Sequence, residues 1–75
     1  MLINMTKTER AIREIEEILK VDTRGLTIQE LSERTRVSRI TASIAIARLE
    51  GEGVIKVRPI GNCKLHYLKK WEKET

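Results

Sequence analysis

The sequence predicts a small α+β fold, mainly helical, in which three helices precede a two-stranded β-hairpin. Three observations support this prediction. Apolar residues recur every three or four positions in the first two thirds of the chain, as they do on helices packed against a core. Polar capping residues precede these stretches. The last third of the chain then changes to β-branched residues and an alternating pattern, which is typical of strands.

The composition indicates one small globular domain over residues 1–75, because the chain is 40% hydrophobic and 35% charged. With one Trp, one Tyr and no Phe, the core must consist of Ile, Leu, Val and Ala side chains. A single cysteine rules out an intramolecular disulfide, and no Cys/His cluster indicates zinc. The opening apolar run is too short for a signal sequence or a membrane span. We therefore expect a cytoplasmic protein without membrane association.

Charge is distributed unevenly along the chain, whose net charge is +4. Residues 1–33 carry five Lys/Arg and seven Asp/Glu, whereas residues 34–75 carry ten Lys/Arg and four Asp/Glu. A basic C-terminal half suggests an anionic partner, most simply nucleic acid. Charge alone is equally consistent with a solvated surface rich in Lys and Glu.

The first helix is predicted over residues 6–20. Thr6 and Glu9 match a capping box, in which each side chain accepts a hydrogen bond from the other residue's backbone N–H. The apolar stripe of this helix consists of Ala11, Ile12, Ile15, Ile18 and Leu19. Three apolar residues precede the helix and either cover it or face a second subunit: Leu2, Ile3 and Met5.

A second, short helix is predicted after a connection at residues 21–25. Thr27, with Glu30 three residues later, forms another capping-box pattern, and the helix that it opens should end near Thr35. Two arginines at the end of this helix and in the turn after it, Arg34 and Arg36, suit phosphate contacts and solvated positions equally well.

The third helix is predicted over Arg39–Glu50. Ser38 is a good N-cap for it, and Gly51 and Gly53 mark its end. Val37 is apolar within a polar turn, so it should fill the space between the second and third helices.

The hairpin is predicted from three consecutive segments. Residues 54–58 are rich in β-branched side chains, Pro59–Asn62 carry turn chemistry, and residues 63–68 alternate with period two. A short strand near Gly25–Thr27 could pair with the edge of this hairpin. Residues 69–75 either start a fourth helix or fray.

Three segments of this chain resemble a known family: Leu31–Thr35, Val37–Arg39 in the turn, and Arg48–Ile55 at the end of the third helix and beyond. They are similar to the winged helix-turn-helix domains of the MarR/ArsR/TrmB-like set of prokaryotic transcription regulators. The resemblance covers about two thirds of the chain, and its motifs are specific for the fold rather than for one regulator.

The resemblance implies a helix-turn-helix core at residues 27–50 and a wing at residues 54–68. It places the third helix in the major groove of double-stranded DNA and the wing on the backbone or in the minor groove. The positions that correspond to DNA contacts in the family are Ser38, Arg39, Thr41, Ser43 and Arg48, with Arg58 and Lys64 flanking the turn of the wing.

Helical geometry, at about 100° per residue, divides the third helix into two apolar faces. The predicted buried face consists of Ala42, Ala45, Ile46 and Leu49. The opposite face consists of Ile40, Ile44 and Ala47. An Arg, Gln or Asn is more usual in the family where Ile44 lies. This outward face cannot hydrogen-bond to bases, but it could contact thymine methyl groups or a partner protein.

We therefore predict that the protein is a small transcription regulator that binds double-stranded DNA as a homodimer. We expect no cofactor, metal or small-molecule ligand. The candidate DNA-contacting residues are Ser38, Arg39, Ile40, Thr41, Ser43, Ile44, Arg48, Arg58 and Lys64. The alternatives are a protein–protein interaction module that uses the outward apolar face of the third helix, and an RNA-binding module.

An enzyme is not expected, because the sequence has no carboxylate pair in an apolar setting, no Gly-rich phosphate loop and no nucleophile beside a base. His66 and Cys63 are interpreted as ordinary strand residues. Trp71, four residues after Tyr67, is interpreted as an anchor that packs on the first helix or on a second subunit.

Overall fold

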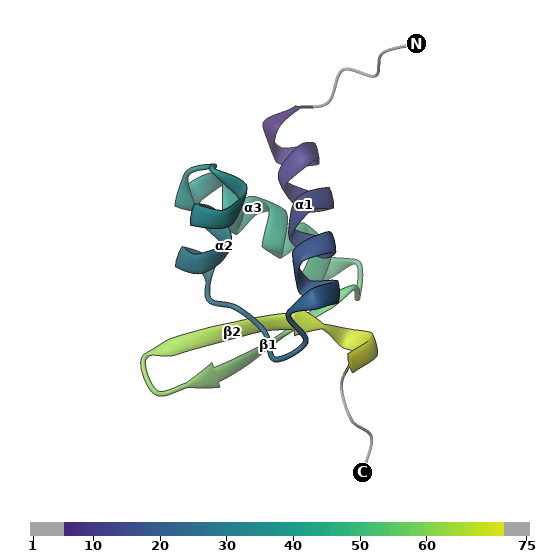
Figure 1. Cartoon of the computed structure of the whole chain (residues 1–75), viewed down its shortest axis with the longest axis vertical. Helices are drawn as coiled ribbons and strands as arrows, with labels where there is room; N and C mark the ends of the chain where they lie inside the picture. Colours follow the sequence, from purple (N-terminus) through teal and green to yellow (C-terminus); the bar gives the residue numbers. More distant parts are fainter. Residues whose placement is uncertain (1–5, 72–75) are drawn as a thin grey trace.

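The computed structural model of the chain describes residues 6–71. The predictions for Leu2, Ile3 and Met5 fall outside the described residues, as does the prediction for the side chain of Trp71. The elements are α1 (Lys7–Val21), α2 (Ile28–Thr35), α3 (Arg39–Gly51), β1 (Ile55–Ile60), β2 (Cys63–Leu68) and the short 3-10 helix η1 (Lys69–Trp71). The predicted order of three helices followed by a hairpin is confirmed, and the hairpin crosses below the helices (Figure 1).

Both predicted capping boxes are present. The backbone N–H of Thr6 donates to Glu9 Oε1 at 3.0 Å, and the N–H of Glu9 donates back to Thr6 Oγ1 at 3.1 Å. Thr27 and Glu30 make the same exchange at 2.9 and 3.2 Å. Each box satisfies backbone donors that have no partner inside the helix, so it fixes where α1 and α2 begin.

The helix ends differ slightly from the prediction. α1 continues to Val21, which was assigned to the connection, because the N–H of Asp22 still donates to the carbonyl oxygen of Ile18 at 2.9 Å. α2 ends at Thr35 as predicted. α3 extends one residue beyond its predicted end and includes Gly51.

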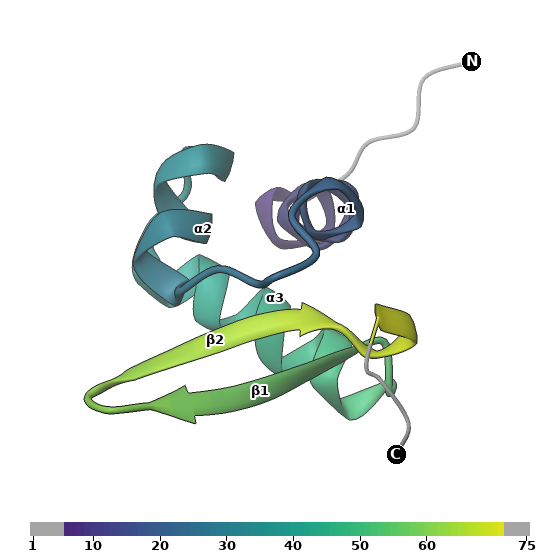
Figure 2. The same cartoon turned by 60° about the horizontal axis from the view of Figure 1, so that its bottom comes forward.

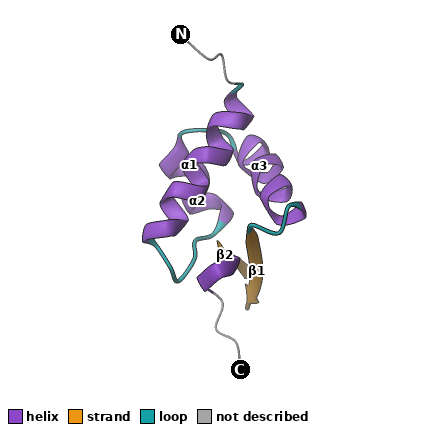
Figure 3. Cartoon of the chain, turned by 90° about the vertical axis from the view of Figure 1, so that its right-hand side faces the viewer, coloured by secondary structure: helices purple, strands orange, loops and turns teal. Residues whose placement is uncertain are grey.

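The turn between α2 and α3 changes the direction of the chain at Arg36, whose φ of 58° is left-handed. The next residue, Val37, is half-buried and packs against the core as predicted. α2 and α3 therefore lie at an angle to each other beside α1, an arrangement that is clearest from the side (Figure 3).

The hairpin turn is shorter than predicted. Pro59 and Ile60, which were assigned to the turn, belong to β1 and pair with Lys64 and Cys63. Gly61 and Asn62 alone connect the strands, because Gly61 adopts a φ of 58° and so allows a two-residue loop. Pro59 is tolerated because the sheet has two strands, and each strand is therefore an edge. The closed end of the hairpin extends past the helices (Figure 2).

The short strand expected near Gly25–Thr27 is reduced to one bridge between Leu26 and His66. The N–H of Leu26 donates to the carbonyl oxygen of His66 at 3.0 Å, and the N–H of His66 donates to that of Leu26 at 2.8 Å. The imidazole Nδ1 of His66 lies 3.1 Å from the same Leu26 oxygen, and the side chain is buried. This bridge ties the connection before α2 to the hairpin.

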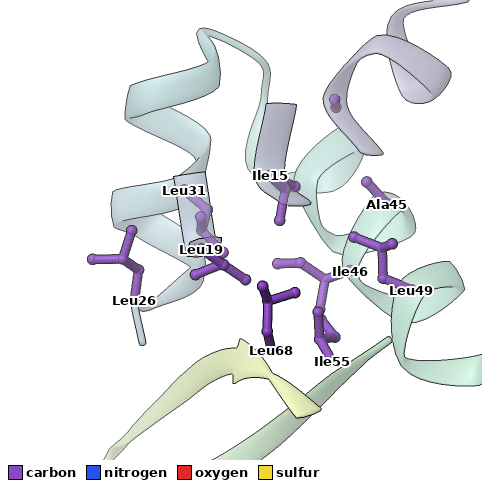
Figure 4. Packing of buried hydrophobic residues seen from close by; sticks show 10 residues of the cluster. Ile15, Leu19, Leu26, Leu31, Ala45, Ile46, Leu49, Ile55 and Leu68 are labelled. Atoms are coloured by element: carbon purple, nitrogen blue, oxygen red, sulfur yellow. The ribbon is translucent and has the colours of Figure 1, made fainter. Parts of the chain in front are cut away.

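The core lies where the three helices meet the base of the hairpin (Figure 4). Its buried members are Ala11, Ile15, Leu19, Leu26, Leu31, Ala45, Ile46, Leu49, Ile55 and Leu68. They are all aliphatic, as the composition predicted. Ala11 and Ala45 are fully buried, and such small side chains let helices approach closely.

Candidate nucleic-acid interface

The two faces of α3 are arranged as predicted. Ala42, Ala45, Ile46 and Leu49 are buried. On the opposite side Ile40 is 75% exposed, Ile44 is 53% exposed, and Ala47 is also exposed. We call these three residues the α3 crest. It is the part of α3 that faces furthest away from the core.

The N-terminus of α3 is closed by Ser38 and Thr41. The hydroxyl oxygen of Ser38 accepts from the backbone N–H of Thr41 at 3.1 Å, and the Ser38 hydroxyl donates to Thr41 Oγ1 at 3.2 Å. The two side chains therefore hold each other in place. The first backbone N–H groups of α3 have no carbonyl partner inside the helix, and with the helix dipole they favour an anion such as phosphate.

A hollow of about 530 Å³ separates α3 from the hairpin. Arg39, Ser43 and Glu50 line it from α3, and Lys64 lines it from β2. Three of the predicted contact residues are thus brought to one surface, although 25 positions of sequence separate Arg39 from Lys64. Because the hollow is open to solvent, an extended anionic ligand could contact both elements at once.

Arg58 and Lys64 flank the wing turn, but the strand register places them on opposite faces of the hairpin. Arg58 pairs with Leu65, and Lys64 pairs with Pro59. Paired residues share a face, and successive residues alternate between faces. Lys64 therefore lies on the face of buried His66, which is turned towards the helices, while Arg58 lies on the outer face.

Two arginines near α3 are engaged in ion pairs. Arg48 Nε lies 3.9 Å from Glu52 Oε2, and both side chains are more than half exposed. Such an exposed pair contributes little energy, so it leaves the guanidinium able to contact phosphate. Arg34 Nη1 lies 3.0 Å from Asp22 Oδ2, which ties α2 to the connection after α1. This ion pair accounts for Arg34 without a phosphate contact.

The hairpin carries basic residues that the prediction did not include. Between Val54 and Lys70 the chain has five Lys/Arg and no Asp or Glu. Of these residues, Lys56 shares the outer face of the hairpin with Arg58. The signal that could have identified Lys56 is this long stretch without an acidic residue, which makes the whole wing positively charged.

Residues 6–56 match the family model described as winged helix-turn-helix DNA-binding. The chain belongs to this family. The match includes α1, the helix-turn-helix and the first residues of β1, so the rest of the hairpin is established by the structure. A search of curated proteins finds no match to the chain. Membership of the winged helix-turn-helix family indicates double-stranded DNA binding by a small regulator, which agrees with the prediction from the sequence.

Within residues 6–71, no helix is long and apolar enough to cross a membrane. The same residues contain no group of three or more His, Cys, Asp and Glu side chains that could hold a metal ion. Cys63 is an exposed thiol beside the wing turn.

Proposed function

We propose that this winged helix-turn-helix protein is a transcription regulator of the MarR/ArsR/TrmB-like kind, with α3 in the major groove and the hairpin as its wing on the backbone or in the minor groove. One observation carries this proposal. The recognition helix and the basic hairpin line a common open hollow, with Arg39 on one side and Lys64 on the other. A groove between two positively charged elements suits a phosphate backbone.

The proposed contacts divide by chemistry. Phosphates would be neutralised by Arg39 and Arg48 on the exposed side of α3 and by Arg58 and Lys64, which flank the wing turn on its two faces. Ser38, Thr41 and Ser43 would add polar contacts near the N-terminal half of α3, where the helix dipole also favours phosphate. Ile40 and Ile44 would face the bases from the α3 crest.

We further propose that residues 1–75 form one domain, with its helix-turn-helix core at 27–50 and its wing at 54–68, that acts as a homodimer without enzymatic activity in the prokaryotic cytoplasm. A single module with so few base-reading side chains would bind loosely, and two copies would read two half-sites. The apolar residues Leu2, Ile3 and Met5, with Trp71, are the proposed dimer contacts. Molecular mass in solution, measured by light scattering, tests this point, and a monomer at binding concentrations would contradict it.

The test of DNA binding is a mobility-shift titration of random-sequence duplex at low salt. We expect a shift for the wild type and a loss of about tenfold or more in affinity for Arg39→Ala with Arg48→Ala, since each lost phosphate contact weakens electrostatic binding. Both side chains are exposed, so the variant should fold normally. Absence of binding to any duplex at low salt would overturn the proposed function.

A further inference from the structure

The α3 crest has no side chain that can hydrogen-bond to a base. Ile40 and Ile44 are 75% and 53% exposed, and Ala47 completes the surface one turn further on. All three end in methyl groups. A recognition helix usually presents an amide or a guanidinium to base edges, because the major groove displays hydrogen-bonding groups.

The polar residues beside the α3 crest are directed elsewhere. Ser38 and Thr41 bond to each other at the start of the helix. Arg39 and Ser43 line the hollow that faces the wing. Arg48 lies on the other flank, within 3.9 Å of Glu52. The groups that can donate hydrogen bonds therefore border the crest, and the crest itself offers only apolar surface.

In the major groove, the C5-methyl group of thymine is the apolar feature of the base edges. An isoleucine placed over guanine or cytosine would cover hydrogen-bonding groups without replacing their water, and each such group would lose its partner. The same isoleucine placed over a thymine methyl group removes apolar surface from water on both sides.

We infer that the α3 crest reads thymine methyl groups, so that Ile40 and Ile44 determine a preference for A·T base pairs in the major groove. This inference rests on the proposed function, because it requires α3 to lie in that groove. Arg39, Arg48 and Lys64 would hold the flanking phosphates, while the isoleucines supply the discrimination between base pairs.

The surroundings of the α3 crest favour DNA over a protein partner. The buried centre of a protein interface is depleted in charged residues. Here charged side chains of both signs flank the crest, because Glu50 lines the same hollow as Arg39 and Glu52 pairs with Arg48. The excess of positive charge comes from the neighbouring hairpin, which has no acidic residue between Val54 and Lys70. Positive charge around a narrow apolar strip complements a polyanion that carries methyl groups along its groove.

The experiment compares two duplexes that differ only in methyl groups. One is a short duplex of mixed A·T sequence, and the other carries deoxyuridine at every thymine, which keeps the hydrogen-bonding pattern and removes the C5-methyl groups. Each methyl group buried against an isoleucine should contribute a factor of about four in affinity, and two should contribute about fifteenfold. We therefore expect the wild type to prefer the thymine duplex by about four- to fifteenfold.

The variant Ile40→Ser with Ile44→Ser should lose this preference and bind both duplexes with similar affinity. Comparing the ratio for the variant with that for the wild type cancels any effect of deoxyuridine on duplex shape. The control is Val21→Ser, which removes another exposed β-branched apolar side chain, 84% exposed, from the end of α1 and should keep the full preference.

Equal binding of the two duplexes by the wild type would overturn the inference and leave DNA binding intact. An equal preference in the wild type and the double variant would overturn it as well, because the discrimination would then come from other residues. Failure to bind either duplex at low salt would instead contradict the proposed function. These outcomes separate the reading of methyl groups from DNA binding itself.

Discussion

The two proposed phosphate contacts at the wing turn should set about half of the salt dependence of DNA binding. The proposed phosphate contacts involve four cations: Arg39 and Arg48 on α3, Lys64 on the inner face of the hairpin and Arg58 on its outer face. Each neutralised phosphate makes the slope of log affinity against log salt more negative by about 0.9, so four contacts in one protomer should give a slope of about −3.6. Arg58→Ala with Lys64→Ala should reduce it to about −1.8. Between about 50 and 200 mM salt, the affinity would then fall about 150-fold for the wild type and about 12-fold for the variant.

Fluorescence anisotropy of a labelled duplex, titrated at a series of salt concentrations, measures these slopes. The control is Arg10→Ala with Arg13→Ala, which removes the same net charge from the exposed surface of α1. We expect this control to keep the wild-type slope, because both arginines belong to the N-terminal half of α1, and it is the C-terminal end of α1 that lies against the hairpin (Figure 1). A dimer would double the slopes and leave their ratio unchanged. The reasoning is refuted if the wing variant keeps the wild-type slope, or if the α1 variant reduces it as much.

Three further predictions concern stability, and urea denaturation tests each of them. Ser38→Ala should lower the free energy of unfolding by about 1 kcal/mol through loss of the N-cap of α3, and an unchanged midpoint would contradict that role. Gly25→Ala should lower the free energy of unfolding by about 1 kcal/mol or more, because the φ of Gly25 is +100° and a Cβ there would lie 3.0 Å from a β2 carbonyl oxygen. Gly51→Ala is the contrast: no atom lies within 4 Å of a Cβ at that position, so the change should raise the free energy of unfolding by about 0.5–1 kcal/mol. Leu49→Ala should lower the free energy of unfolding by about 2–5 kcal/mol, whereas Ile44→Ser should change it by no more than about 0.5 kcal/mol. Similar losses for the two variants would mean that the exposed face of α3 also supports the fold.

The local parts of the fold could be predicted because their signals lie within a few residues. A capping box needs only two positions three residues apart, and both boxes form as expected, at Thr6 and at Thr27. The buried and exposed faces of α3 follow from helical spacing alone. Ser38 was identified as its N-cap for the same reason, since the acceptor and the N–H that it caps belong to neighbouring residues.

The features that the prediction missed depend on contacts between distant residues. The burial of His66 follows from its bridge to Leu26, 40 positions away, which no local pattern records. The ion pair between Asp22 and Arg34 likewise depends on how α2 packs. The hairpin turn was predicted to begin two residues too early because Pro59 is typical of turns, whereas an edge strand tolerates proline.

The first half of α3 carries two alanines inward, Ala42 and Ala45, and two isoleucines outward, Ile40 and Ile44. This arrangement separates folding from binding. Ala42 and Ala45 are fully buried, where little room remains between α3 and the neighbouring helices. Ile40 and Ile44 are exposed, so packing does not require their size, and serine would serve a helix surface about as well. Apolar surface left in water contributes no burial energy to the folded chain. The two isoleucines can therefore contribute burial energy only when a ligand covers them. Substitutions on this face should change which DNA is bound and leave the stability of the fold nearly unchanged.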